Sequence, residues 1–167
     1  MLRILDITAP DINNGNGIRI TLWVAGCWHH CKGCHNQWTW NHNQGTIFKD
    51  HKEEIYEKLS EWLKRDYVEG LTFSGGDPLC QDVEGIEDEM EIIDWVRENY
   101  PDKNIWLYCG DYYDELPDGS LEKMLCDMCD VIVEGPYVEE LRDVAHTPFR
   151  GSTNQKIRYI KSKENNS

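Results

Sequence analysis

The sequence lacks any apolar run long enough to cross a membrane. Its longest runs, at residues 20–26 and 105–109, are far shorter than the about 20 apolar residues that a spanning helix needs. Residues 1–10 mix Arg3 and Asp6 into their apolar positions and do not follow the signal-peptide pattern. We therefore expect a cytoplasmic protein with no membrane partner.

Basic residues are also scarce. Lysine and arginine total 17 against 31 aspartates and glutamates, which gives a formal net charge of −14. A field of that sign repels a phosphate backbone, so we expect no nucleic-acid partner. The simplest interpretation of the acidic surface is solubility, and attraction to a basic protein surface is the alternative.

Nothing in the chain marks a domain boundary. The 167 residues contain no internal repeat, no low-complexity segment and no linker, so we expect a single domain over residues 1–160 and a polar C-terminal tail at 161–167. Strand-like and helix-like segments alternate along the domain. We expect strands at residues 3–8, 18–25, 70–74, 104–109, 130–134 and 156–160, and helices at 50–65, 83–99 and 121–128.

This alternation predicts an α/β fold with a mostly parallel sheet. The units are too few for a closed eight-stranded barrel, which takes about 250 residues, so we expect an open, partial (β/α) barrel. Loops at the carboxyl ends of its strands would carry the functional site. The cysteine-rich residues 25–36, residues 75–78 and Gly110 each follow a predicted strand and are expected to meet at one rim.

Three of the seven cysteines lie close together in the pattern C-x3-C-x2-C: Cys27, Cys31 and Cys34. Three thiolates on so compact a loop can ligate three irons of a [4Fe–4S] cluster and leave the fourth iron open to a small chelating ligand. A closed Cys3His zinc site is the alternative, completed by one histidine of the loop: His29, His30 or His35. The spacing favours iron–sulfur, because structural zinc sites more often take their ligands as two separated pairs.

The four remaining cysteines lie outside this pattern: Cys80, Cys109, Cys126 and Cys129. Cys126 and Cys129 have the spacing of a second metal site or a redox pair. They lie between the apolar residues 121–125 and 131–133, however, so buried thiols that pack as small apolar groups are the favoured interpretation.

The C-x3-C-x2-C loop after a strand resembles the radical S-adenosylmethionine (radical SAM) superfamily. The preceding N-G-x-G-x-R is similar to the glycyl-radical activating enzymes of that superfamily and consists of Asn14, Gly15, Gly17 and Arg19. Five further segments have the order found in the anaerobic ribonucleoside-triphosphate reductase-activating proteins: residues 33–40, 71–79 (LTFSGGDPL), 105–110 (IWLYCG), 131–137 (VIVEGPY) and 150–155 (RGSTNQ). The resemblance to this family thus covers residues 14–155.

The chain departs from the family pattern at three places. Asn16 stands where proline is usual, and His35 where tyrosine is usual. Residues 134–136 read E-G-P, where D-G-K or D-G-R is common. None of these positions is a cluster ligand, so the departures concern loop dynamics and partner contact rather than the chemistry.

The resemblance implies a cofactor and a reaction. Cys27, Cys31 and Cys34 would hold the cluster, and S-adenosyl-L-methionine would chelate its open iron. Reduced flavodoxin or a similar donor would supply an electron, and the resulting 5′-deoxyadenosyl radical would take a hydrogen atom from a glycine on the large catalytic subunit of the anaerobic (class III) ribonucleoside-triphosphate reductase. No catalytic side chain beyond the cluster ligands is expected. Cofactor contacts are expected from six residues: Gly33, Cys34, His35, Gly75, Gly76 and Asp77.

Two motif features have less definite expected roles. Arg19 is expected to brace the cysteine loop or to pair with a carboxylate. The block from Arg150 to Gln155 is expected to be a polar loop that closes the sheet edge or contacts the cofactor or the partner.

Several alternatives stay open at this point. The chain can activate another glycyl-radical enzyme such as pyruvate formate-lyase, act on a small molecule, or be a non-enzymatic zinc module. Its assembly would be a homodimer or a heterotetramer with the reductase.

Overall fold

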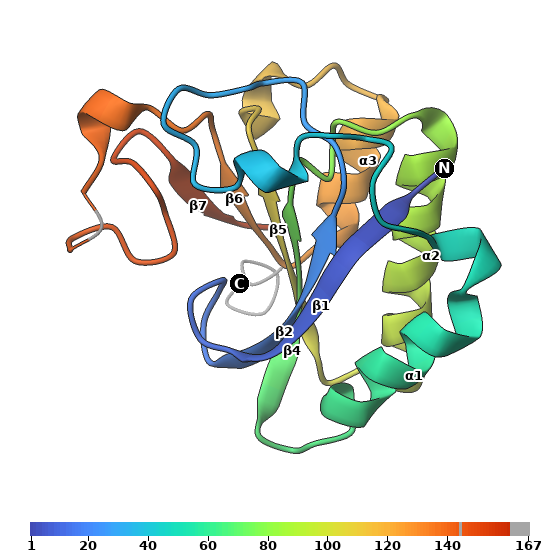
Figure 1. Cartoon of the computed structure of the whole chain (residues 1–167). Coiled ribbons are helices and arrows are strands. Elements are labelled where there is room, and N and C mark those ends of the chain that lie inside the picture. Colours follow the sequence, from blue (N-terminus) through green and yellow to red (C-terminus); the bar gives the residue numbers. More distant parts are fainter. Residues whose placement is uncertain (144, 161–167) are drawn as a thin grey trace.

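One mixed sheet organises the described part of the chain. The computed structural model describes residues 1–143 and 145–160, so the predicted polar tail lies outside the described residues. The strand order is β3-β1-β2-β4-β5-β6-β7 (Figure 1). The strands are β1 (Arg3–Asp11), β2 (Ile18–Val24), β3 (Thr46–Ile47), β4 (Val68–Gly75), β5 (Asn104–Cys109), β6 (Val131–Glu134) and β7 (Lys156–Tyr159). The helices are α1 (Lys52–Leu63), α2 (Val83–Asn99) and α3 (Leu121–Met128).

The predicted α/β class is confirmed, with one correction to the sheet. β2, β4, β5 and β6 are parallel, as expected. The β1–β2, β1–β3 and β6–β7 pairings are antiparallel, so the expectation of a mostly parallel sheet is wrong at both margins. Only residues 12–17 join β1 to β2, and so short a connection makes an antiparallel pair because a parallel one needs a crossover of about a dozen residues or more.

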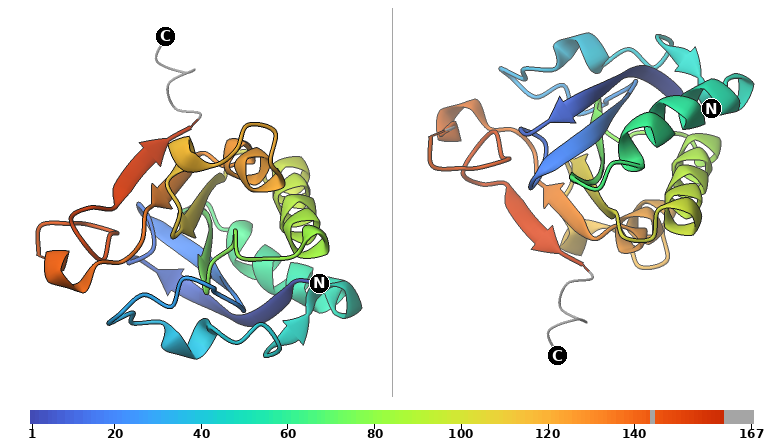
Figure 2. Two further views of the ribbon diagram at one scale, coloured as in Figure 1. Left: turned by 90° about the horizontal axis from the view of Figure 1, so that it is seen from above. Right: turned by 90° about the horizontal axis from the view of Figure 1, so that it is seen from below.

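The three helices lie on the same side of the curved sheet (Figure 2). In α1, Ile55, Leu59 and Leu63 recur every four residues and are buried in the core. The Asp82 carboxylate accepts a hydrogen bond from the Gly85 amide at 2.7 Å and so caps the start of α2. None of these helices is long and apolar enough to cross a membrane.

Loops gather at the carboxyl ends of the parallel strands, in the upper part of Figure 1. They follow β2, β4, β5 and β6 and comprise residues 25–45, 76–82, 110–120 and 135–155. This is the rim on which the sequence places the functional site, and the opposite ends of the same strands carry none of the predicted site residues.

Arg19 is buried at the amino end of β2 and differs from both expectations for it. Its guanidinium donates to Thr72 Oγ1 at 2.8 Å, Asn104 Oδ1 at 2.7 Å and Leu71 O at 3.0 Å. Two longer bonds reach the carbonyls of Asn16 and Asn104. All five recorded bonds therefore join β2 to β4, β5 and the loop before β2, and none reaches the cysteine loop or a carboxylate. Burial lowers the pKa of Arg19 to about 10.

Arg19→Lys is expected to lower the free energy of unfolding by about 2 kcal/mol. A lysine keeps the charge but has three donors on one atom, so it cannot satisfy acceptors on three sides as the planar guanidinium does. Urea unfolding of the cluster-free protein measures the change. Arg3→Lys is the matched control, because Arg3 makes only an exposed bond to the Gly45 carbonyl at 3.3 Å, and a loss there equal to that at Arg19 would contradict the explanation.

Candidate metal centre

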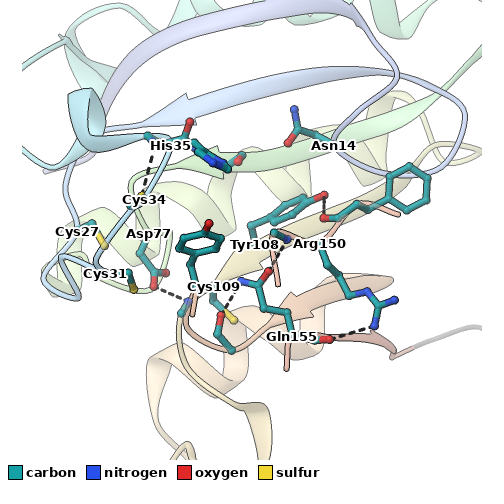
Figure 3. A pocket seen from close by; sticks show the side chains of 18 of the residues that line it. Asn14, Cys27, Cys31, Cys34, His35, Asp77, Tyr108, Cys109, Arg150 and Gln155 are labelled. Carbon is teal, nitrogen blue, oxygen red and sulfur yellow. Dashed lines mark hydrogen bonds between the residues drawn. The ribbon is translucent and has the colours of Figure 1, made fainter. Parts of the chain in front are cut away.

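A cavity of about 540 Å³ lies among the loops at the carboxyl rim (Figure 3). Cys27, Cys31 and Cys34 line it on one side, and Arg150 lines it on the opposite side. Of the predicted cofactor contacts, five line the cavity: Cys34, His35, Gly75, Gly76 and Asp77. The sixth, Gly33, is not among the described lining residues and faces the Glu139 side chain instead. The structure therefore brings the predicted loops together around one cavity.

The cysteine loop is held by its own backbone. The Gly26 amide donates to the Thr39 carbonyl at 2.7 Å, and the Cys27 amide donates to the Trp40 carbonyl at 3.2 Å. Gly26 has a φ of 105°, and a Cβ there would collide with the His42 ring, so this position requires glycine. These bonds fix both ends of the loop before any metal is bound.

The donor atoms of the three loop cysteines are not gathered as a zinc ion requires. A tetrahedral zinc ion holds its sulfur ligands about 3.8 Å apart, because each Zn–S bond is about 2.3 Å. In the described part of the chain, only two groups of three donor residues bring their atoms within 4.8 Å of one another: Cys27 with Asp77 and Cys80, and His29 with Asp77 and Asp111. The three thiols of the C-x3-C-x2-C pattern do not form one of these groups.

The loop histidines also have other partners. His29 Nε2 lies 2.9 Å from an Asp77 carboxylate oxygen. The His30 ring stacks on Trp40 with centroids 4.3 Å apart, and the His35 ring is tilted against Tyr137 at 5.4 Å. None of the three completes a Cys3His set in the described structure.

The Cys27 sulfur lies in surroundings that favour a thiolate. A hydrogen bond from the Cys80 thiol and the backbone amides of His29 and His30 lower the pKa of Cys27 to about 6, although burial opposes this change. A thiolate is the form that ligates iron. The donor chemistry at this position therefore fits an iron–sulfur cluster.

Asp77 connects three loops of the rim. Its Oδ1 accepts from the Leu79 amide at 2.8 Å, and its Oδ2 accepts from the Gly110 amide at 2.8 Å. His29 Nε2 pairs with the same Oδ2, and hydrogen bonds to Asp111 and Asp77 raise the pKa of His29 to about 11. The carboxylate is 2% exposed. It has about four acceptor positions in all, so one remains for a ligand.

The structure gives a reason for glycine at positions 75 and 76 that the sequence did not show. The Gly76 amide donates to the Val24 carbonyl at 2.9 Å, and the Asp77 amide donates to the Gly26 carbonyl at 2.7 Å. A Cβ on Gly76 would collide with the Gly26 carbonyl. The two glycines therefore let the loop after β4 pack directly on the stem of the cysteine loop, while both still line the cavity.

Comparisons with known proteins agree with this geometry. Residues 13–158 match the family model described as a 4Fe-4S single cluster domain. The chain is 36% identical over 153 residues to the anaerobic ribonucleoside-triphosphate reductase-activating protein of Escherichia coli (strain K12), covering 90% of this chain and 94% of that protein. It is 37% identical over 162 residues to the protein of that name from Haemophilus influenzae, covering 96% and 99%, and 35% identical over 147 residues to that of Enterobacteria phage T4, covering 88% and 87%.

The chain belongs to the family of anaerobic ribonucleoside-triphosphate reductase-activating proteins. The resemblance read from the sequence is confirmed. The matched 4Fe-4S domain contains all three cysteines of the loop and decides for iron–sulfur over zinc.

The C-terminal block of this family member closes the loop after β6. Gln155 Oε1 accepts from the Gly151 amide at 2.7 Å, and Gln155 Nε2 donates to the Gly135 carbonyl at 2.9 Å. Asn154 Nδ2 donates to the Pro136 carbonyl at 2.7 Å. The block thus shapes one wall of the cavity by binding backbone, and Arg150 and Gln155 both line that wall.

Three features of the family member's site were missed in the sequence. The His29–Asp77 ion pair joins residues 48 positions apart, and nothing local signals it. Tyr108 and Tyr137 line the cavity from β5 and from the loop after β6. Cys80 lies beside Cys27, whereas Cys126 and Cys129 are fully buried, as expected of apolar packing.

Proposed function

We propose that this chain is the activating enzyme of an anaerobic (class III) ribonucleoside-triphosphate reductase. The observation that carries the proposal is the cavity wall formed by Cys27, Cys31 and Cys34. Cys27, Cys31 and Cys34 would hold a [4Fe–4S] cluster as thiolate ligands, and an iron without a protein ligand would be available to a small chelating ligand. The name of the relatives gives an anaerobic ribonucleoside-triphosphate reductase as the target. We propose that its large catalytic subunit is the protein substrate.

S-adenosyl-L-methionine is the proposed occupant of the cavity. A volume of about 540 Å³ lies within the range of about 300–1,000 Å³ that is usual for small-molecule sites. When bound together, the reduced cluster and S-adenosylmethionine supply one-electron cleavage of a C–S bond and removal of a hydrogen atom from a glycine of the partner. The contacts from this chain are proposed at Gly33, Cys34, His35, Gly75, Gly76 and Asp77.

Each of these residues has a positioning role in the proposal. Gly75 and Gly76 present backbone at the cavity wall, because neither has a side chain to keep a ligand away. The remaining acceptor position of Asp77 and nearby carbonyls take the ligand's ammonium group. The His35 ring, tilted on Tyr137, offers a flat surface for adenine, and Gly33 acts through the backbone of the loop rather than at the wall.

The cavity lies among the loops of the rim and is partly open to solvent, which suits a protein substrate. A flexible glycine loop of the reductase enters there, whereas a small-molecule substrate would need a lid to keep water out. The opening is what favours the activating role over a small-molecule radical enzyme.

The remaining parts of the proposal follow from family membership. The fold is an open, partial (β/α) barrel of the radical SAM type, in a single domain over residues 1–160. The protein acts in the cytoplasm with reduced flavodoxin or a similar electron donor, and it assembles as a homodimer or as a heterotetramer with the reductase.

Anaerobic reconstitution with the partner tests this function. We expect a brown protein with broad absorption near 400 nm, which forms 5′-deoxyadenosine and produces a glycyl-radical doublet in the electron paramagnetic resonance spectrum of the large reductase subunit. Pyruvate formate-lyase in place of the reductase is the matched control and is expected to give no doublet. A colourless, zinc-loaded protein would contradict the proposal, as would a doublet on pyruvate formate-lyase alone.

A further inference from the structure

Cys80 is a buried thiol beside the proposed cluster but outside the C-x3-C-x2-C pattern. It is 4% exposed and lies in the loop that joins β4 to α2, residues 76–82. The sulfurs of Cys27 and Cys80 and a carboxylate oxygen of Asp77 all lie within 4.8 Å of one another. Cys80 is not among the residues that line the cavity in the described structure.

The position of Cys80 is fixed from several directions. Its amide donates to the Asp77 carbonyl at 2.9 Å, and His42 Nε2 lies 2.8 Å from the Cys80 carbonyl. Gln81 Nε2 donates to the carbonyls of Ala25 and Asp77 at 2.9 and 3.2 Å. These bonds tie the turn that carries Cys80 to the stem of the cysteine loop. The backbone therefore holds the Cys80 and Cys27 sulfurs close together.

The chemistry of the pair sets the direction of the hydrogen bond. Cys27 must lose its proton to ligate iron. A metal-bound thiolate has no proton to give, so in a hydrogen bond between the two neighbouring sulfurs Cys27 is the acceptor and the Cys80 thiol is the donor.

We propose that Cys80 is a positioning residue that donates an S–H···S hydrogen bond to the cluster ligand Cys27 and raises the reduction potential of the cluster. The inference rests on the proposed function, because Cys27 must carry an iron. A hydrogen bond to a ligand sulfur draws electron density away from the cluster and so stabilises its reduced, more negative form. Cys80 would thus ease the electron uptake on which activation depends.

The test compares full-length chains carrying Cys80→Ala or Cys80→Ser after anaerobic reconstitution. Iron is counted, and the reduction potential is measured by a dithionite titration followed by electron paramagnetic resonance, without S-adenosylmethionine. We expect every chain to hold four irons. Cys80→Ala is expected to lower the equilibrium constant for reduction about threefold, a shift of roughly 28 mV at about 59 mV per tenfold. Cys80→Ser should stay near the unsubstituted chain, because its hydroxyl still donates.

Controls separate this inference from a packing effect and from the proposed function. Cys129→Ala removes another buried thiol, which follows α3 and donates to the Leu125 carbonyl of that helix at 3.4 Å, and should leave the potential unchanged. If alanine at position 80 prevents folding, Cys80→Val removes the donor with less loss of volume.

Three results would overturn the role of Cys80. The first is a reduction potential of Cys80→Ala equal to that of the unsubstituted chain. The second is an equal shift of the potential in Cys80→Ser and Cys80→Ala. The third is a loss of iron from Cys80→Ala, which would make Cys80 a ligand. By contrast, an unsubstituted chain that binds no cluster would refute the proposed function itself.

Discussion

Alanine at Cys27, Cys31 or Cys34 is expected to abolish cleavage of S-adenosylmethionine. Each substitution removes one of the three proposed protein ligands of the cluster. The other cysteine that lines the cavity, Cys109, is not part of the C-x3-C-x2-C loop and is not expected to take the place of the lost ligand. The loop itself should survive, because its stem is held by the Gly26–Thr39 and Cys27–Trp40 backbone bonds. Anaerobic assays of 5′-deoxyadenosine together with iron counts measure both the activity and its cause.

Cys126→Ala is the matched control for these three substitutions. Cys126 is a fully buried thiol of α3 and does not line the cavity in the described structure. Its removal is expected to leave cleavage largely intact, with a small loss of stability from the missing sulfur. Substantial cleavage by any of the three loop variants would remove that cysteine from the ligand set.

The order and type of the three helices and of every strand except β3 could be predicted, because each of these elements carries a local signal. The four-residue recurrence of Ile55, Leu59 and Leu63 predicts α1, and the apolar run at residues 104–109 predicts β5. The antiparallel margins could not be predicted in the same way. β3 has only two residues, and the four residues of β7 carry no pattern that distinguishes a parallel from an antiparallel partner.

In the candidate site, too, residues in short motifs could be predicted, and long-range contacts could not. The three cysteines and Gly75–Asp77 stand in short motifs, so the sequence alone singles them out. Spacing left both iron–sulfur and zinc open for the cysteines, and the expected role of Gly75–Asp77 came from the resemblance to the family. The Arg19 hydrogen bonds reach residues up to 85 positions away, and no pattern near Arg19 distinguishes a backbone anchor from a brace for the cysteine loop. Cys80 gave no sign of its place beside Cys27, because only the packing of two loop stems brings their sulfurs together.

Asp77→Ala is expected to reduce cleavage of S-adenosylmethionine at least about 100-fold and to lower the free energy of unfolding by about 3–5 kcal/mol. The substitution leaves the Leu79 and Gly110 amides without their acceptor. It also leaves the buried side of His29 without its carboxylate. The loops after β2, β4 and β5 would then lose their common anchor, which explains why activity and stability should fall together.

Asp111→Ala separates the anchoring role from a simple loss of charge. Asp111 also faces His29, but at 3.6 Å and with a side chain that is 41% exposed. Exposed ion pairs contribute at most about 1 kcal/mol, so this variant should lose little stability and little activity. Urea unfolding of the cluster-free chains and cleavage assays of the reconstituted ones measure the two effects. Equal losses at Asp77 and Asp111 would contradict the assignment of Asp77 as the anchor.

Kinetics with Asp77→Asn then distinguish anchoring from ligand contact. Asparagine keeps one carbonyl oxygen for a backbone amide, but its amino group cannot accept from Gly110 or from a ligand ammonium. If the remaining acceptor position of Asp77 holds S-adenosylmethionine, KM should rise more than kcat falls, because ground-state binding is lost. If Asp77 acts only by aligning the three loops on the cluster, kcat should fall with little change in KM. Either pattern follows from one buried carboxylate that joins the cysteine loop to the rim of the sheet.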